Sequence, residues 1–171
     1  MKSKKNKVSI KIENIGTLQI DYINLKNEDT ILKTEISTIQ FGIILYDSEI
    51  FKTKKLQDIF YVIKNNKDGK TKRPVYKSNE YEFEINKKKQ TSLIKCESNI
   101  LCGNKKDLIF FELYYPSFDN KKNLIGEACF TLNQLESTIS RDTYEAIYIH
   151  NKDRGIIGNL EINYNIEKND F

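Results

Sequence analysis

The sequence predicts an all-β fold, an antiparallel sandwich or barrel, from three observations. Apolar and polar residues alternate in many short segments, which is the period of a strand with one buried face. Turn-forming residues separate these segments at short intervals, as in sandwiches and barrels. The best helical stretch, Leu132 to Glu136, is too short to supply the crossover helices of a parallel α/β sheet.

The first expected strands lie near the N-terminus. Apolar residues alternate from Val8 to Ile12 and again from Leu18 to Tyr22. Gly16 lies between them and can adopt backbone angles that suit a turn or bulge. The polar segment from Leu25 to Ser37 is expected to be a long loop.

A hairpin is expected next. Phe41 to Tyr46 is rich in residues that suit a buried pleated surface, and Phe51 to Leu56 follows after a short turn. The cluster from Asn65 to Gly69 predicts a solvated turn, and Pro74 restrains the entry to the next strand.

Later strands follow the same alternation. In the segment from Tyr81 to Ile85, the apolar side chains are expected to face the core while Glu82 and Glu84 face water. Further strands are expected at Leu108 to Tyr115, Ala128 to Leu132, Ala146 to His150 and Asn159 to Ile166.

The composition bounds the class of protein. A chain of 171 residues with 39% hydrophobic residues can bury a core, and we expect one domain over residues 1–171, with a basic tail at 1–7 and a core at about 8–167. The N-terminal segment lacks an apolar secretory core. No apolar run approaches the roughly 20 residues needed to cross a bilayer, so any membrane contact is expected to be peripheral.

Cysteine usage and charge favour an intracellular, cytoplasmic protein. Cys96, Cys102 and Cys129 are an odd number without close pairing, so reduced thiols are expected. The net charge is only +4, a mild bias toward anionic partners. Basic residues are interspersed with acids and no stacking platform is evident, so nucleic-acid binding is not expected.

The order of motifs in the second half of the chain resembles the C2 domain family. The strand from Leu108 to Tyr115 is followed by a loop, by Asn123 to Ala128 with its Ile-Gly pair, and by Leu132 and Leu135; Gly158 to Tyr164 looks like a closing strand. C2 domains are Greek-key sandwiches that bind phospholipids or proteins through loops at one end. The resemblance implies this fold and a docking role.

The resemblance extends over the first half, to about Thr17. Gly16 to Leu25 looks like the opening strand, Phe41 to Leu45 with Phe51 to Lys54 is similar to the central hairpin, and Pro74 to Tyr76 with Asn79 to Phe83 is similar to the family's Asn-Pro-aromatic, Asn-Glu and Phe signature, although Arg73 replaces the first Asn.

The resemblance also predicts a divergent member that does not depend on calcium. Calcium-dependent members hold the ion with aspartates from two apical loops, because a hard cation needs several carboxylates. The matched positions fall on Tyr115, Ser117, Asn123 and near Ile39, and the remaining Asp29 and Asp119 have no partner set. No metal or other cofactor is therefore expected.

Two lysine clusters are candidate binding residues for lipid or partner. The first, Lys52, Lys54 and Lys55, resembles the lysine-rich strand that some C2 domains use for phosphoinositides; the alternative is a solvated strand that discourages edge pairing. The second, Lys87, Lys88 and Lys89, joins the first into an anion site only if the fold brings them together, and is otherwise a solvated turn.

An apical loop supplies two further candidate contacts, Tyr115 and Phe118. In the C2-like arrangement both lie near the tip, where an exposed aromatic ring can anchor at a membrane interface or in a protein partner. The alternative is that these rings pack inward under the loop.

No constellation of residues predicts catalysis. His150 is the only histidine, and with Cys96 and Cys102 it gives the wrong number and spacing of ligands for a metal site. Gly155 to Gly158 lacks the Lys-Ser or Lys-Thr of a phosphate loop. We therefore expect a non-catalytic docking module for an anionic phospholipid surface or a protein partner; the alternative is a cytoskeletal or ciliary scaffold that makes protein contacts alone.

Overall fold

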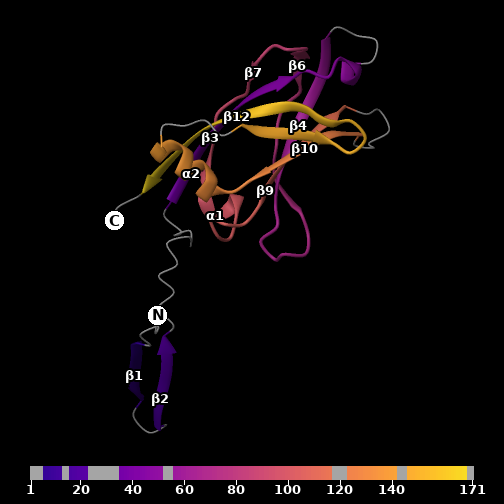
Figure 1. Cartoon of the computed structure of the whole chain (residues 1–171). Coiled ribbons are helices and arrows are strands. Elements are labelled where there is room, and N and C mark those ends of the chain that lie inside the picture. The colour runs from indigo at the N-terminus through magenta and orange to yellow at the C-terminus, as the bar shows by residue number, and fades with distance from the viewer. Residues whose placement is uncertain are drawn as a thin grey trace. The chain divides into compact units, whose positions relative to one another are not determined.

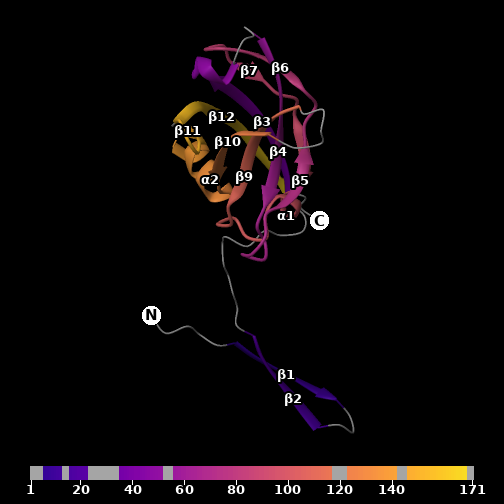
Figure 2. The same ribbon diagram turned by 90° about the vertical axis from the view of Figure 1, so that its right-hand side faces the viewer.

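The computed structural model describes residues 6–12, 16–22, 35–51, 56–116, 123–141 and 146–168. The chain divides into two compact units, Met1–Thr30 and Ile31–Phe171. Figures 1 and 2 show the two units in views a quarter turn apart, and each is described by itself below.

The first unit contains a two-stranded antiparallel sheet. Strands β1 (Asn6–Ile12) and β2 (Gly16–Tyr22) pair along their full length, with Val8 opposite Ile20. The strands predicted here are therefore confirmed. However, β2 pairs with β1 in a separate sheet, so it does not open the sandwich as the resemblance implied. The prediction of a single domain over residues 1–171 stays a prediction.

In its described residues, the second unit is an antiparallel sandwich of ten strands and three short helices, which confirms the predicted all-β class. The strands are β3 (Glu35–Leu45), β4 (Leu56–Asn65), β5 (Arg73–Lys77), β6 (Tyr81–Glu84), β7 (Lys89–Gln90), β8 (Ile94–Glu97), β9 (Ile109–Tyr115), β10 (Asn123–Phe130), β11 (Ile147–Asn151) and β12 (Gly155–Lys168). The helices are the 3-10 helix η1 (Ser48–Phe51) and the α-helices α1 (Ser98–Leu101) and α2 (Leu132–Arg141).

The strand order β5-β4-β9-β10-β11-β12-β3-β7 runs through two sheets. Strands β10 and β11 are joined at a single pair, Glu127 and His150, so we divide the path there. The first sheet contains β4, β5, β6, β9 and β10, and the second contains β3, β7, β8, β11 and β12. Helices α1 and α2 lie toward one end of this unit (Figures 1 and 2).

The core lies between the inner faces of the two sheets. Phe41 of β3 packs against Phe111 of β9 with ring centroids 4.9 Å apart, and Tyr61 of β4 stacks on Phe111 at the same distance. All three side chains are fully buried. A buried aromatic pair adds about 0.5–1.5 kcal/mol beyond its buried area, so the contact between Phe41 and Phe111 helps hold the two sheets together.

The predicted hairpin between Phe41 to Tyr46 and Phe51 to Leu56 is wrong. Strand β3 pairs with β12 in the second sheet, whereas β4 pairs with β9 in the first. The connection between them crosses the sandwich and contains η1, which includes Phe51. The described part of β4 runs from Leu56 to Asn65, and its buried apolar residues, Ile59 to Ile63, follow the segment that was predicted as the second strand of the hairpin.

Other predicted strands are confirmed with shifted ends. Strand β10 begins at Asn123, ahead of the predicted Ala128, and Leu132 belongs to α2 because Thr131 Oγ1 accepts the backbone N–H of Gln134 at the start of that helix. Strand β12 begins at Gly155. No helix in the described ranges is long and apolar enough to span a membrane.

Candidate docking surface

The structure tests only part of the predicted lysine clusters. Lys52, Lys54 and Lys55 lie outside the described residues, so their role and their contact with the second cluster stay predictions.

The second predicted cluster follows β6, and two of its lysines bind acids of the chain itself. The Nζ of Lys87 lies 2.9 Å from a carboxylate oxygen of Glu84, and Lys88 forms an ion pair with Glu161 of β12. Lys89 is half-buried on β7 opposite Ile43. Their role in binding stays a prediction, but an anion would have to compete with Glu84 and Glu161.

The predicted tip residues are partly described. Phe118 lies outside the described residues. Tyr115 ends β9 half-buried, and burial raises the pKa of its phenol, an effect that Arg154 opposes and Asp47 reinforces. Arg154 is itself held by Asp47 and Glu49, at 3.5 and 2.5 Å. The Tyr115 ring is thus partly packed at a charged end of the sandwich, and its role as an anchor stays a prediction.

A different cluster of cations and rings occupies the outer face of the first sheet. Phe60 and Lys64 of β4 share this face with Phe110 and Tyr114 of β9, since Phe60 lies opposite Tyr114 and Lys64 opposite Phe110 in the register. The rings of Phe60 and Tyr114 stack with centroids 5.5 Å apart. We call this surface the lysine-aromatic face; it comprises Phe60, Val62, Lys64, Lys72, Lys77, Phe110, Glu112 and Tyr114.

A buried carboxylate organises the centre of the lysine-aromatic face. Glu112 is only 3% exposed, and its Oε2 lies 2.5 Å from the Nζ of Lys64 and accepts the hydroxyl of Tyr114. Burial alone would raise the pKa of Glu112, but Lys64 and Tyr114 stabilise the carboxylate and hold the pKa below its ordinary value. Lys64 and Glu112 therefore stay charged at neutral pH.

Two further lysines cover rings on the same face. The Nζ of Lys77 lies 4.6 Å from the centroid of Phe60, and the Nζ of Lys72 lies 4.1 Å from the centroid of Phe110. Lys72 also pairs with Glu127 at 2.8 Å and with Glu112 at 3.6 Å. Because a lysine can lay its alkyl chain on an apolar surface while its ammonium group stays in water, this arrangement presents cations above a row of rings.

The lysine-aromatic face has a signal in the sequence that alternation does not capture. Ile59 to Ile63 and Ile109 to Tyr115 are nearly continuous apolar or aromatic runs, which indicate strands covered on both faces. Lys64, Lys72 and Lys77 do not form a run in the sequence, so only the strand pairing shows that they lie on one surface.

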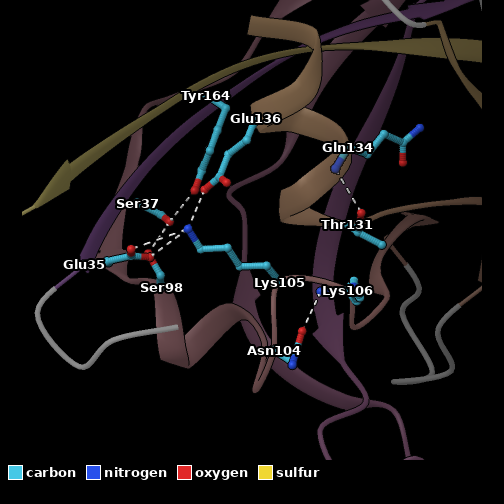
Figure 3. Close-up of polar contacts among 10 residues, drawn as sticks. All are labelled: Glu35, Ser37, Ser98, Asn104, Lys105, Lys106, Thr131, Gln134, Glu136 and Tyr164. Atoms are coloured by element: carbon cyan, nitrogen blue, oxygen red, sulfur yellow. Dashed lines mark hydrogen bonds and ion pairs between the residues drawn. The ribbon is translucent and has the colours of Figure 1, made fainter. Parts of the chain in front are cut away.

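A second group of charged side chains is buried near α1 and α2 (Figure 3). The Nζ of Lys105 lies 2.8 Å from Glu136 of α2 and 3.3 Å from Glu35 at the start of β3. Next to it, the hydroxyl groups of Ser37 and Ser98 are 2.6 Å apart. Since Lys105 and Glu35 are almost fully buried, we interpret this cluster as an anchor that ties α2 to β3.

The described residues offer little for catalysis. They contain no group of three or more side chains able to hold a metal ion. The three cysteines are unpaired, and burial raises the pKa of the Cys102 thiol to about 12, which keeps it protonated at neutral pH. Gly155 to Gly158 form the start of a strand rather than a loop that could cradle phosphate.

Comparisons with known proteins agree with the architecture. No protein-family model and no curated protein matches the chain by sequence. A solved structure described as BON1-C2B matches with a TM-score of 0.59 and 16% identity, over 79% of this chain and 93% of that one. A structure of CC2D1B, described as coordinating ESRCT-III activity during the mitotic reformation of the nuclear envelope, matches with a TM-score of 0.51 and 14% identity, over 97% of this chain and 63% of that one.

The chain thus has a C2-like fold. The antiparallel two-sheet sandwich and the match to BON1-C2B confirm the fold that the motif order predicted. At these identities the likeness concerns the fold alone.

Proposed function

We propose that the C2-like domain is a non-catalytic docking module that binds an anionic membrane surface through the lysine-aromatic face, without calcium. The observation that carries the proposal is the placement of Lys64, Lys72 and Lys77 beside the rings of Tyr114, Phe110 and Phe60 on one sheet face. The domain would act from the cytoplasm as a peripheral protein.

The physical basis is the sum of several weak attractions. A lysine near an anionic leaflet contributes about 1 kcal/mol, so only a cluster gives measurable binding. Lys70 is exposed two residues before Lys72 and is expected to extend the positive charge of the face, whereas Arg73 is paired with Asp68 at 2.9 Å. Glu112 and Glu127 offset part of this charge, so Lys70 and Lys77, which pair with no described carboxylate, are expected to contribute most.

The described tip supports independence from calcium. Of the positions matched to calcium ligands, Tyr115, Asn123 and Ile39 are described and none carries a carboxylate; Ile39 is buried within β3 and not in a loop. Asp47 and Glu49, two of the described acids near this end, are engaged by Arg154. Because calcium sites need several carboxylates free to coordinate, this pattern disfavours a calcium-dependent mechanism.

Vesicle co-sedimentation of the full chain tests the proposal. We expect sedimentation with phosphatidylcholine vesicles that contain phosphatidylserine, in the presence of a calcium chelator, and none with phosphatidylcholine alone. The double variant Lys70→Glu, Lys77→Glu should lose this binding. A matched control, Lys95→Glu with Lys152→Glu, reverses the same charge at exposed lysines away from the lysine-aromatic face and should retain more of it.

Two outcomes would contradict this mechanism. Equal loss in the two double variants would show that net charge, and not the lysine-aromatic face, drives binding. Binding that requires calcium would show that the tip carries the site.

The second candidate function is a scaffold that makes protein contacts alone. It is favoured by the engagement of Lys87 and Lys88 with acids and by the exposed apolar side chains Tyr148 and Ile156 on neighbouring strands. Absence of sedimentation with every vesicle, for a folded protein, would favour this alternative.

A further inference from the structure

A pocket opens on the outer surface where the two sheets meet. Strands β10 and β11 pair only at Glu127 and His150, and the space beside this pair forms a pocket of about 360 Å³. We call it the seam pocket. Phe110 and Cys129 line it from the first sheet, Tyr148 and His150 line it from the second, and α2, which lies near these strands in Figure 2, contributes Gln134.

The lining combines rings with one acid. Among the described lining residues, Glu127 is the only aspartate, glutamate, lysine or arginine, and the rings of Phe110 and Tyr148 belong to the same pocket. A carboxylate beside aromatic rings favours a cation, because the ring faces carry negative potential. The seam pocket therefore differs in charge preference from the lysine-aromatic face next to it.

The chain itself shows that these groups hold a cation. The ammonium group of Lys72 lies 4.1 Å from the centroid of Phe110 and 2.8 Å from Oε2 of Glu127. A carboxylate has about four lone-pair sites, so Glu127 can accept further hydrogen bonds. Lys72 also lies 3.6 Å from Glu112, so it keeps a carboxylate partner if it moves off Phe110.

The surroundings of the pocket suit a protein rather than a small molecule. Tyr46, Tyr148 and Ile156 are 40%, 47% and 47% exposed on the outer face of the second sheet. Ile156 lies opposite His150 of the pocket. The pKa of the Tyr46 phenol is raised by burial and by the nearby Tyr148, which places these two rings close together. Exposed aromatic and aliphatic side chains beside a pocket are typical of protein interfaces.

We propose that the seam pocket receives an arginine side chain from a protein partner, whose neighbouring apolar residues cover Tyr148 and Ile156. A planar guanidinium can stack on a ring and at the same time donate two hydrogen bonds to the carboxylate of Glu127. Lys72 is the internal competitor for the same groups. This site differs from the membrane-docking surface in that it binds a cation, although the two surfaces share Phe110 and Lys72.

Titration of the isotope-labelled full chain by NMR tests the pocket directly. The probe is the peptide acetyl-Leu-Arg-Leu-amide, and the matched control peptide carries citrulline, which keeps the shape of arginine and lacks its charge. We expect chemical-shift changes centred on Glu127, Cys129 and Tyr148. The citrulline peptide should bind on the order of tenfold more weakly, because it loses the charge-assisted hydrogen bonds.

Two pairs of variants separate the pocket from general charge effects. Glu127→Gln should weaken the arginine peptide on the order of tenfold, whereas Glu161→Gln, which alters a similarly exposed carboxylate that also binds a lysine, should not. Lys72→Ala should tighten binding by about two- to threefold because it frees Phe110 and Glu127. Lys95→Ala removes the same charge elsewhere and should leave binding unchanged.

Three results would overturn the proposal: equal binding of the citrulline peptide, shift changes centred away from the seam pocket, or weaker binding in Lys72→Ala. The last variant also guards against misfolding, since a damaged pocket cannot bind more tightly. Vesicle binding by the lysine-aromatic face can fail without affecting any of these measurements.

Discussion

The buried cluster around Lys105 gives the sharpest prediction about stability. The side chains of Lys105 and Glu35 are 7% and 5% exposed, and the same ammonium group also binds Glu136. In Lys105→Met, two carboxylates lose their cation, and the one on Glu35 has almost no access to water. Removing one partner of a buried ion pair costs about 3–5 kcal/mol, which is a large part of the 5–15 kcal/mol expected for a whole domain.

Urea denaturation of the full chain, followed by circular dichroism, measures this loss. We expect the free energy of unfolding to fall by about 3–5 kcal/mol in Lys105→Met. The control is Lys95→Met, which breaks the exposed pair with Glu167 and should cost at most about 1 kcal/mol.

A combined variant tests the mechanism of the loss. Replacing Glu35 and Glu136 by Gln together with Lys105→Met removes the unpaired buried charges, so it should recover part of the stability. The reasoning is refuted if Lys105→Met costs no more than Lys95→Met, or if the combined variant is less stable than Lys105→Met alone. The contacts raise the pKa of Lys105, so their contribution should persist through neutral pH and be lost only as the pH rises through the raised value.

Three further predictions concern single residues. Folding lowers the pKa of Glu112, so the carboxylate should stabilise the fold above its ordinary pKa of 4.5 and lose this effect as the pH falls through the lowered value. The difference in unfolding free energy between the wild type and Glu112→Gln should therefore shrink when it is measured from pH 7 to pH 3. A Cβ at Gly158 would lie 2.4 Å from the backbone oxygen of Ile44, so Gly158→Ala should lower the unfolding free energy by about 1–3 kcal/mol in the same urea assay, and a neutral effect would contradict the close strand packing. Iodoacetamide should alkylate the exposed Cys129 well before Cys102, whose thiol is buried with a raised pKa, and mass spectrometry of digested protein would show the order; faster reaction of Cys102 would mean that the core opens locally.

The sequence predicted the fold class and several strands because period-two alternation survives wherever only one sheet face is buried. Strand β6 is such a case: Phe83 is buried while Glu82 is exposed. Strand β4 was missed because Ile59 to Ile63 is buried on both faces, inward by the core and outward under the lysine-aromatic face, so its apolar run does not alternate. The wrong hairpin prediction has the same cause, because without β4 the segment from Phe51 to Leu56 was the next candidate partner for β3.

The candidate docking surface was not predictable from local sequence for a different reason. Lys88 looked free within its basic run, yet it binds Glu161 from a strand far along the chain. Conversely, Lys64, Lys72 and Lys77 are separated in sequence and meet only because β4 lies between β5 and β9. Charge pairing across a sheet depends on strand order, and strand order is not encoded in any single segment.

The order of strands also restricts how any partner can attach. The longest strand, β12, is enclosed by β11 and β3, while β5, β6, β7 and β8, which pair on one side only among the described strands, span five residues or fewer. Away from the seam between β10 and β11, which are joined at one residue pair, these short borders offer little free backbone for an incoming strand to extend the sheet, and they also discourage self-association into fibrils. Recognition of a partner away from the seam is therefore expected to depend on side chains and not on strand addition. Single substitutions of such side chains can alter selectivity without changing the fold.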